Sequence, residues 1–353
     1  MPRRDIERGS GIGRWLLPAA VLVLVGGGGA AFYLAGDRVS EQLHFFLANG
    51  SGGDLAAVPQ PRISAANRGA ADLNEMPALV ATDGATPESW PDLGPADLLA
   101  QSAALGDRAL RDTGFDQPPW RRFARPFTAP EGKPMIGLLV TGLGNDRAVT
   151  AAAIAGLPAE VSLSFNPYAK DLADWIAAAR AFGHEALVDL PLQSKARHDT
   201  GALGLMIGLN EDETDRRIGA IADLAPAVFG FAGEGGDALL LDDTATALVA
   251  REIARRGLAF IDLSGEPMSQ MKSAAAETGL AAARGSITLD ERPSRTAMTE
   301  RLAAAAAVAQ EQGRVLAVAR ASPLTVTVLG DWLRRLGDDG PVAAPASALL
   351  QRE

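Results

Sequence analysis

Five carboxylates follow short apolar runs of the kind that form buried parallel strands, and they are the side chains of this sequence best suited to chemistry: Asp189, Glu234, Asp242, Asp262 and Asp290. Carboxylates gathered at one edge of a sheet could act as a general acid and base, or hold a hard cation such as Ca²⁺ or Mg²⁺. Each comes from a different strand, so spacing alone does not show that they meet. A structural role, capping a helix or pairing with an arginine, explains them more simply.

Histidine is absent from these strand ends, where the other polar residues include Thr141, Gln193 and Arg320. His184 follows Gly183 and is interpreted as bonding to loop backbone, whereas His198 lies in a polar segment that could contact a substrate. Zinc sites in proteins rely chiefly on histidine and cysteine, but the chain has no cysteine and none of its three histidines lies at these strand ends. We therefore predict no metal cofactor, with a divalent cation on the carboxylates as the alternative.

The elements that position these residues begin near residue 135, where short apolar runs alternate with helical segments. Such runs are typical of strands that are covered on both faces. The alternation predicts a parallel sheet, open or closed into a barrel, with function at the carboxyl ends of its strands. The expected strands are MIGLLV, VSLSF, EALVDL, AVFGFA, ALLL, LAFIDL, SITL and VLAVA.

The N-terminal part predicts a membrane anchor. Residues 15–35 are uncharged and apolar, long enough for a helix that crosses a bilayer, and they follow a tail, residues 1–14, that contains four arginines. The positive-inside rule puts that tail in the cytoplasm. A cleaved signal peptide is the alternative. Residues 36–130 are expected to form a low-order periplasmic linker, residues 131–340 the folded domain and residues 341–353 a C-terminal tail.

The overall charge limits the class of partner. The chain has 353 residues and a formal net charge of -10, whereas nucleic-acid binding relies on clustered lysine and arginine. We therefore expect no nucleic-acid partner.

Several segments, in their order and spacing, resemble the divergent polysaccharide deacetylase family, bacterial envelope proteins related to the NodB-type carbohydrate esterases. The similarity runs from about Trp120 to Leu336 and is carried by PMIGLLVTGLGNDRAVT, LSFNPYAKD, ARAFGHEALVDLPLQS, LMIGLNEDETDRRI, RRGLAFIDLSGEP and GRVLAVARASPLTV. The resemblance implies a deformed (β/α) barrel and an ancestral reaction, the metal-assisted removal of acetyl groups from an amino-sugar polymer.

The sequence departs from that family's metal site. Thr141 and Gly142 stand where the family has paired aspartates, Asp189 where it has a histidine, and Gln193 where it has a glutamate. The segment around Gly233 lacks the family's Asn-Asn-His, and Arg320 falls within its late Gly-His-Pro-His. Tyr168, Asp262 and Asp290 are among the positions that are kept.

The sequence thus predicts an inner-membrane envelope protein whose periplasmic domain has lost metal catalysis and binds a glycan, a peptidoglycan fragment or an envelope protein. The binding residues expected at the barrel mouth are Thr141, Tyr168, Asp189, Gln193, Glu234, Asp290 and Arg320. The alternative is an active amino-sugar deacetylase or hydrolase with Asp262 as a remaining acid or base. Arg320 is expected to pair with Asp262 or Asp189, and a purely scaffolding barrel is a third alternative.

Overall fold

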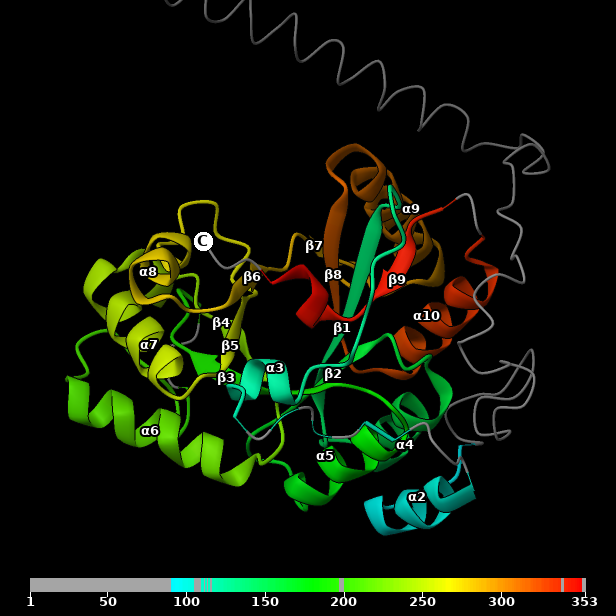
Figure 1. The fold of residues 1–353 in the computed structure, drawn as a ribbon, viewed down its shortest axis with the longest axis horizontal. Helices are drawn as coiled ribbons and strands as arrows, with labels where there is room; N and C mark the ends of the chain where they lie inside the picture. Colours follow the sequence, from blue (N-terminus) through cyan, green and yellow to red (C-terminus); the bar gives the residue numbers. More distant parts are fainter. Residues whose placement is uncertain are drawn as a thin grey trace, which may run out of the picture. The chain divides into compact units, whose positions relative to one another are not determined.

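The computed structural model describes residues 90–104, 109, 110, 112, 114, 116–196, 200–337 and 340–350 (Figure 1). In chain order the elements are α2 (Pro95–Ser102), α3 (Pro119–Arg122), β1 (Met135–Leu143), α4 (Arg147–Gly156), β2 (Ser162–Phe165), α5 (Leu172–Ala181), β3 (Ala186–Leu192), α6 (Glu211–Leu224), β4 (Gly230–Gly235), the 3₁₀ helix η7 (Leu239–Leu241), α7 (Asp243–Arg255), β5 (Ala259–Asp262), α8 (Met271–Thr278), β6 (Ala282–Arg284), β7 (Ile287–Thr288), α9 (Arg295–Gln312), β8 (Arg314–Arg320), α10 (Pro323–Arg335), β9 (Val342–Ala344) and the 3₁₀ helix η8 (Ala346–Leu349).

The strands form one sheet in the order β6-β5-β4-β3-β2-β1-β8-β7, and β9 pairs with the first residues of β1, on the edge opposite β8. Every pairing is parallel, which confirms the parallel sheet that the sequence predicts. Among the described strands, β6 and β7 do not pair with each other, so the sheet is a half-barrel with an open seam between its two end strands. This architecture is consistent with the expected NodB-like barrel.

Alternate residues of the strands pack into two hydrophobic cores, one on each face of the sheet. Leu138 and Val140 of β1 pack in the larger core, to which the helices contribute their apolar faces. Leu139, between them, belongs to a second cluster that also contains Phe229 and Ile261. Because side chains alternate between the faces of a strand, this second cluster fills the inside of the half-barrel.

A buried carboxylate closes the end of the half-barrel opposite the carboxyl ends of its strands. Glu185, which precedes β3, is fully buried and accepts hydrogen bonds from Ser162 Oγ (2.7 Å), from Arg125 N (3.0 Å), and from both N (3.0 Å) and Oγ of Ser347. One side chain therefore joins the segment before β1, the start of β2 and the 3₁₀ helix η8.

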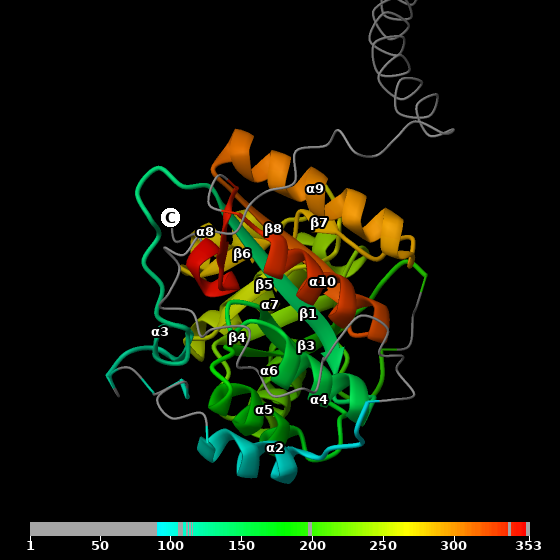
Figure 2. The same cartoon turned by 90° about the vertical axis from the view of Figure 1, so that its right-hand side faces the viewer.

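The domain extends beyond the predicted boundaries at both ends. Residues 342–344 form β9 on β1, and Leu349 is buried in the inner core, so residues 341–350 are not a tail. Residues 90–102 belong to the domain too, because Leu98 of α2 is fully buried and α2 packs against α5 (Figure 2). The three residues of β9 are too few for their periodicity to be recognised.

One predicted strand is wrong. The run Ala238–Leu241 ends in the 3₁₀ helix η7, after which Asp242 accepts a hydrogen bond from Ala245 N (2.8 Å) and caps α7. Leu239 and Leu240 are buried all the same. A short apolar run indicates that its residues are buried, but it does not distinguish a strand from a helical turn.

The predicted membrane anchor, residues 15–35, lies outside the described residues, as does His198. Within the part of the chain that the structure describes, no helix has the length and apolar character needed to cross a bilayer.

Candidate functional site

Asp189 lies at the centre of the cluster that the structure brings together. It is on β3, in register with Ala232 of the inner core, and only 1% of its surface is exposed. Ser164 Oγ donates a hydrogen bond to one carboxylate oxygen (2.5 Å), and Gly142 N donates to the other (2.9 Å). Burial raises the pKa of Asp189 from its ordinary 3.8 to about 7, and the charge of Glu234 adds to the rise, although both hydrogen bonds oppose it.

Gly142 reaches Asp189 through an unusual backbone conformation. Its φ is +74°, in the left-handed region that side-chain-bearing residues rarely adopt, and no atom lies within 4 Å of the position that a Cβ would take. An aspartate at this position, as the resemblance would have it, would therefore meet backbone strain rather than a steric clash. The turn uses its amide, not a side chain, to contact β3.

Arg320, at the end of β8, forms the second contact of the cluster. Its Nη1 lies 3.0 Å from Glu234 Oε1, and its backbone N donates to Asp290 Oδ2 (3.0 Å). The predicted pairing of Arg320 with Asp262 or Asp189 is therefore wrong, because Glu234 on β4 provides the partner. Arg320 still acts on Asp189 at longer range, since its positive charge lowers the pKa of that carboxyl group. Thr141 is in register with Arg320 on the neighbouring strand β1.

Asp262 does not join this cluster. It is in register with Gly233, one residue beyond the row that contains Asp189 and Ala232, so its side chain belongs to the other face of the sheet. Its Oδ1 accepts hydrogen bonds from Ser264 N (2.9 Å) and Ser264 Oγ (2.6 Å), which fixes the loop after β5. Asp242 caps α7, so these two acids have the structural roles that the sequence left open.

Two further predicted residues organise the loops of the mouth, the region around the carboxyl ends of the strands. Gln193 Oε1 accepts a hydrogen bond from Ile207 N (2.9 Å). The Tyr168 hydroxyl accepts one from Leu203 N (3.0 Å), while half of the tyrosine surface stays exposed. Both residues thus support the long loop between β3 and α6.

The residues present do not fit the metal that the resemblance implies. Among the described residues, no three His, Cys, Asp or Glu side chains lie close enough together to hold an ion. In His184, the one described histidine, Nδ1 lies 2.8 Å from the backbone oxygen of Val161 and Nε2 lies 3.0 Å from that of Ile154, which agrees with its predicted structural role. Burial lowers the pKa of His184, which disfavours its charged form.

Sequence reasoning missed Ser164, which holds Asp189 from the neighbouring strand. A signal was present, because Ser162 and Ser164 recur with the two-residue period of one strand face in VSLSF. The Gly142 amide gave no such signal, since nothing in a residue's type reports where its backbone N–H points.

Comparison of the sequence with known proteins identifies the family of this chain. A family model described as divergent polysaccharide deacetylase matches residues 138–350. An uncharacterized protein of Haemophilus influenzae is 23% identical over 188 residues, covering 53% of this chain and 67% of its own length. The uncharacterized protein YibQ of Escherichia coli is 22% identical over 196 residues, covering 56% of this chain and 61% of its own length.

A solved structure shares the fold. The crystal structure of uncharacterized protein ATU2773 from Agrobacterium tumefaciens C58 has a TM-score of 0.63 and 26% identity, and the match covers 68% of this chain and 98% of that one. Together with the family model, which spans more than half of the sequence, these similarities show that the chain belongs to the divergent polysaccharide deacetylase family.

Proposed function

We propose that this chain is a membrane-anchored envelope protein whose deacetylase-like domain lacks metal-dependent catalysis and binds a glycan at the mouth of the half-barrel. The carrying observation is the arrangement around Asp189: its two oxygens are engaged by Ser164 and Gly142, and the neighbouring cation is the Arg320 guanidinium, paired with Glu234. A fixed ion pair offers directional donors and acceptors to sugar hydroxyls and leaves no set of metal ligands.

The apolar surface of the mouth supports a binding role. Tyr168, Ile207, Leu224 and Met268 are the large hydrophobic side chains that the described residues expose. Three of these four lie in loops that follow β2, β3 and β5, at the carboxyl ends of the strands. An exposed tyrosine and an ion pair at the same end of the sheet are a combination suited to a sugar ring, whose faces are apolar and whose edges are polar.

The proposal predicts no specific metal site and a measurable affinity for sugars. The full-length chain is expected to contain no stoichiometric zinc and to show no thermal shift with Zn²⁺, Mg²⁺ or Ca²⁺. It should bind N-acetylglucosamine oligomers or soluble peptidoglycan fragments, and Tyr168→Ala should weaken that binding roughly threefold to tenfold, the loss typical of one aromatic contact. Metal analysis, thermal-shift series and titration calorimetry measure these quantities.

Leu224→Ala provides the matched control, because Leu224 is exposed to a similar extent but ends α6, away from the mouth. It should leave sugar affinity unchanged. Stoichiometric zinc, or a loss of affinity that is equal in both variants, would contradict the proposal.

Hydrolysis with a remodelled acidic site is the second candidate, and one observation favours it: a carboxyl group with a pKa near 7 can both donate and accept a proton at neutral pH. Asp189 rather than Asp262 would then be the acid. Release of acetate from an acetylated amino-sugar oligomer, abolished by Asp189→Asn, would favour this candidate over binding alone.

The proposed anchor is residues 15–35, with the domain in the periplasm. The full-length chain is expected to fractionate with the inner membrane, and its domain should be cleaved by protease only after the outer membrane is made permeable. A chain that lacks residues 2–35 provides the control and should leave the membrane fraction. Recovery of the full-length chain in the cytoplasmic fraction would refute the anchor.

A further inference from the structure

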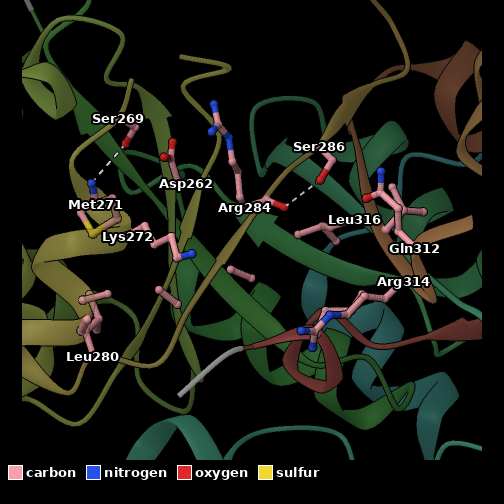
Figure 3. A pocket seen from close by; sticks show the side chains of 16 residues that line it. Asp262, Ser269, Met271, Lys272, Leu280, Arg284, Ser286, Gln312, Arg314 and Leu316 are labelled. Atoms are coloured by element: carbon pink, nitrogen blue, oxygen red, sulfur yellow. Dashed lines mark hydrogen bonds between the residues drawn. The ribbon is translucent and has the colours of Figure 1, made fainter. Parts of the chain in front are cut away.

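A cavity of about 450 Å³ lies in the open seam of the half-barrel, away from the cluster around Asp189 (Figure 3). Its walls come from α8, from β6 and from the first residues of β8, and Leu349 of η8 contributes to them. Neither Asp189 nor Glu234 nor Arg320 lines it. The volume is within the range of small-molecule sites in proteins, roughly 300–1,000 Å³.

Three cations surround this cavity: Lys272 on α8, Arg284 at the end of β6 and Arg314 at the start of β8. Figure 3 shows Lys272 and Arg314 extending toward the cavity from opposite sides, with Arg284 at its other end beside Asp262. Asp262 is the one acid among the described residues that line the cavity, and its carboxylate accepts two hydrogen bonds from Ser264. The local charge is therefore positive.

That charge is unusual for this protein, which has 43 acidic residues against 33 basic ones. Many arginines elsewhere in the described part pair with carboxylates, as Arg295 does with Asp331 (2.7 Å). Arg284 and Arg314 form no ion pair with any described carboxylate. Two guanidinium groups on one cavity, neither paired with a described carboxylate, are positioned to bind an anion.

The remaining walls include apolar side chains and the polar residues Ser269, Ser286 and Gln312. Met271, Leu280, Leu316 and Leu349 supply apolar surface. Within the described residues, β6 has β5 on one side and no strand on the side of the seam. A ligand here would meet cations, apolar side chains and the unpaired edge of a strand together.

From these features we propose that the seam cavity is a second binding site, independent of the mouth, for a small organic anion that carries one carboxylate or phosphate group on an apolar body. The anionic group contacts Arg314, with Lys272 opposite, and the apolar body packs on Leu316, Leu280 and Leu349. Both kinds of anionic group satisfy a guanidinium by paired hydrogen bonds.

Ligand-detected NMR titrations of the full-length chain test this site with four probes: phenyl phosphate, benzoate, inorganic phosphate and benzyl alcohol. Phenyl phosphate or benzoate should bind, and the stronger of the two identifies the anionic group. Inorganic phosphate and benzyl alcohol should each bind more weakly, because phosphate lacks the apolar body and benzyl alcohol lacks the anionic group. Arg314→Gln should weaken the better probe about tenfold, the value of one charge-assisted contact.

Arg335→Gln is the matched control. Arg335 is exposed in the last turn of α10, does not line the cavity, and forms no ion pair with a described carboxylate. It should leave the affinity within about twofold, the scatter expected of a surface change that makes no contact. If Arg314→Gln does not fold, Arg284→Gln replaces it with the same expected direction.

Three results would overturn the proposal: equal losses in the variant and its control, benzyl alcohol or inorganic phosphate binding as well as the better organic anion, or no probe binding more tightly than about 10 mM. Tyr168→Ala should leave the organic anion's affinity unchanged. Failure at the seam and failure at the mouth are therefore distinguishable.

Discussion

Replacing Asp189 with asparagine should stabilise the domain at pH 8 by up to about 4 kcal/mol, and the gain should fade as the pH falls toward 4. The pKa of this carboxyl group is about 7 in the folded chain, against an ordinary value of 3.8. Between these values the folded state binds the proton more tightly than the unfolded state. The stability that Asp189 contributes is therefore present below about pH 4 and is lost as the pH rises through about 7.

Asparagine suits this position because its oxygen can accept from Gly142 N while its amide donates to Ser164 Oγ. The measurement is the thermal midpoint of wild type and Asp189→Asn at several pH values. Two further variants shift the pH dependence in opposite directions. Glu234→Gln should lower the pKa of Asp189, and Arg320→Gln should raise it. A stability difference between wild type and Asp189→Asn that stays constant from pH 5 to pH 8 would contradict this account.

Glu185→Ala should cost about 3–5 kcal/mol of unfolding free energy, the range for removing the charged partner of a buried polar network. The alanine would leave the hydroxyls of Ser162 and Ser347, and the amides of Arg125 and Ser347, without their acceptor. For a domain of this size the thermal midpoint should fall by roughly 10 °C. Chemical denaturation of both proteins gives the free energy directly.

Glu160→Ala is the control for this experiment. Glu160 also contacts Arg125, but through an ion pair (3.0 Å) whose acid keeps 21% of its side chain exposed. Its loss should cost at most about 1 kcal/mol. Similar losses in the two variants would show that the network of Glu185 has no special role.

The fold could be predicted because the same pattern, an apolar run followed by a helical segment, is repeated along the sequence. Apolar runs such as MIGLLV and VLAVA identify strands covered on both faces, and the helices between them leave only a parallel sheet. The predicted boundaries failed where a segment is short: β9 has three residues, and nothing in Val342–Ala344 distinguishes a strand from a tail. What fixes β9 is its pairing with Met135–Gly137, far away in sequence.

The candidate site could be predicted only in part. That Asp189, Glu234 and Arg320 lie in or at the end of strands follows from the apolar runs before them, but which of them pair depends on strand order and register. Glu234 is the partner of Arg320 although the two come from strands separated by β3, β2 and β1 in the sheet. The curvature of the half-barrel brings them together, and one residue's difference in register turns Asp262 to the other face.

The central position of β1 constrains how the chain is made. Its neighbours are β2, which follows soon after, and β8 and β9, which lie near the end of the described chain. A ribosome that releases residues in order therefore completes the first strand long before two of its three partners exist. Until Arg314–Arg320 emerge, one edge of this apolar strand has no partner and is open to aggregation. Completion of the sheet must follow synthesis of the chain as far as Ala344, so a chaperone that shields β1 in the meantime would raise the yield of folded protein.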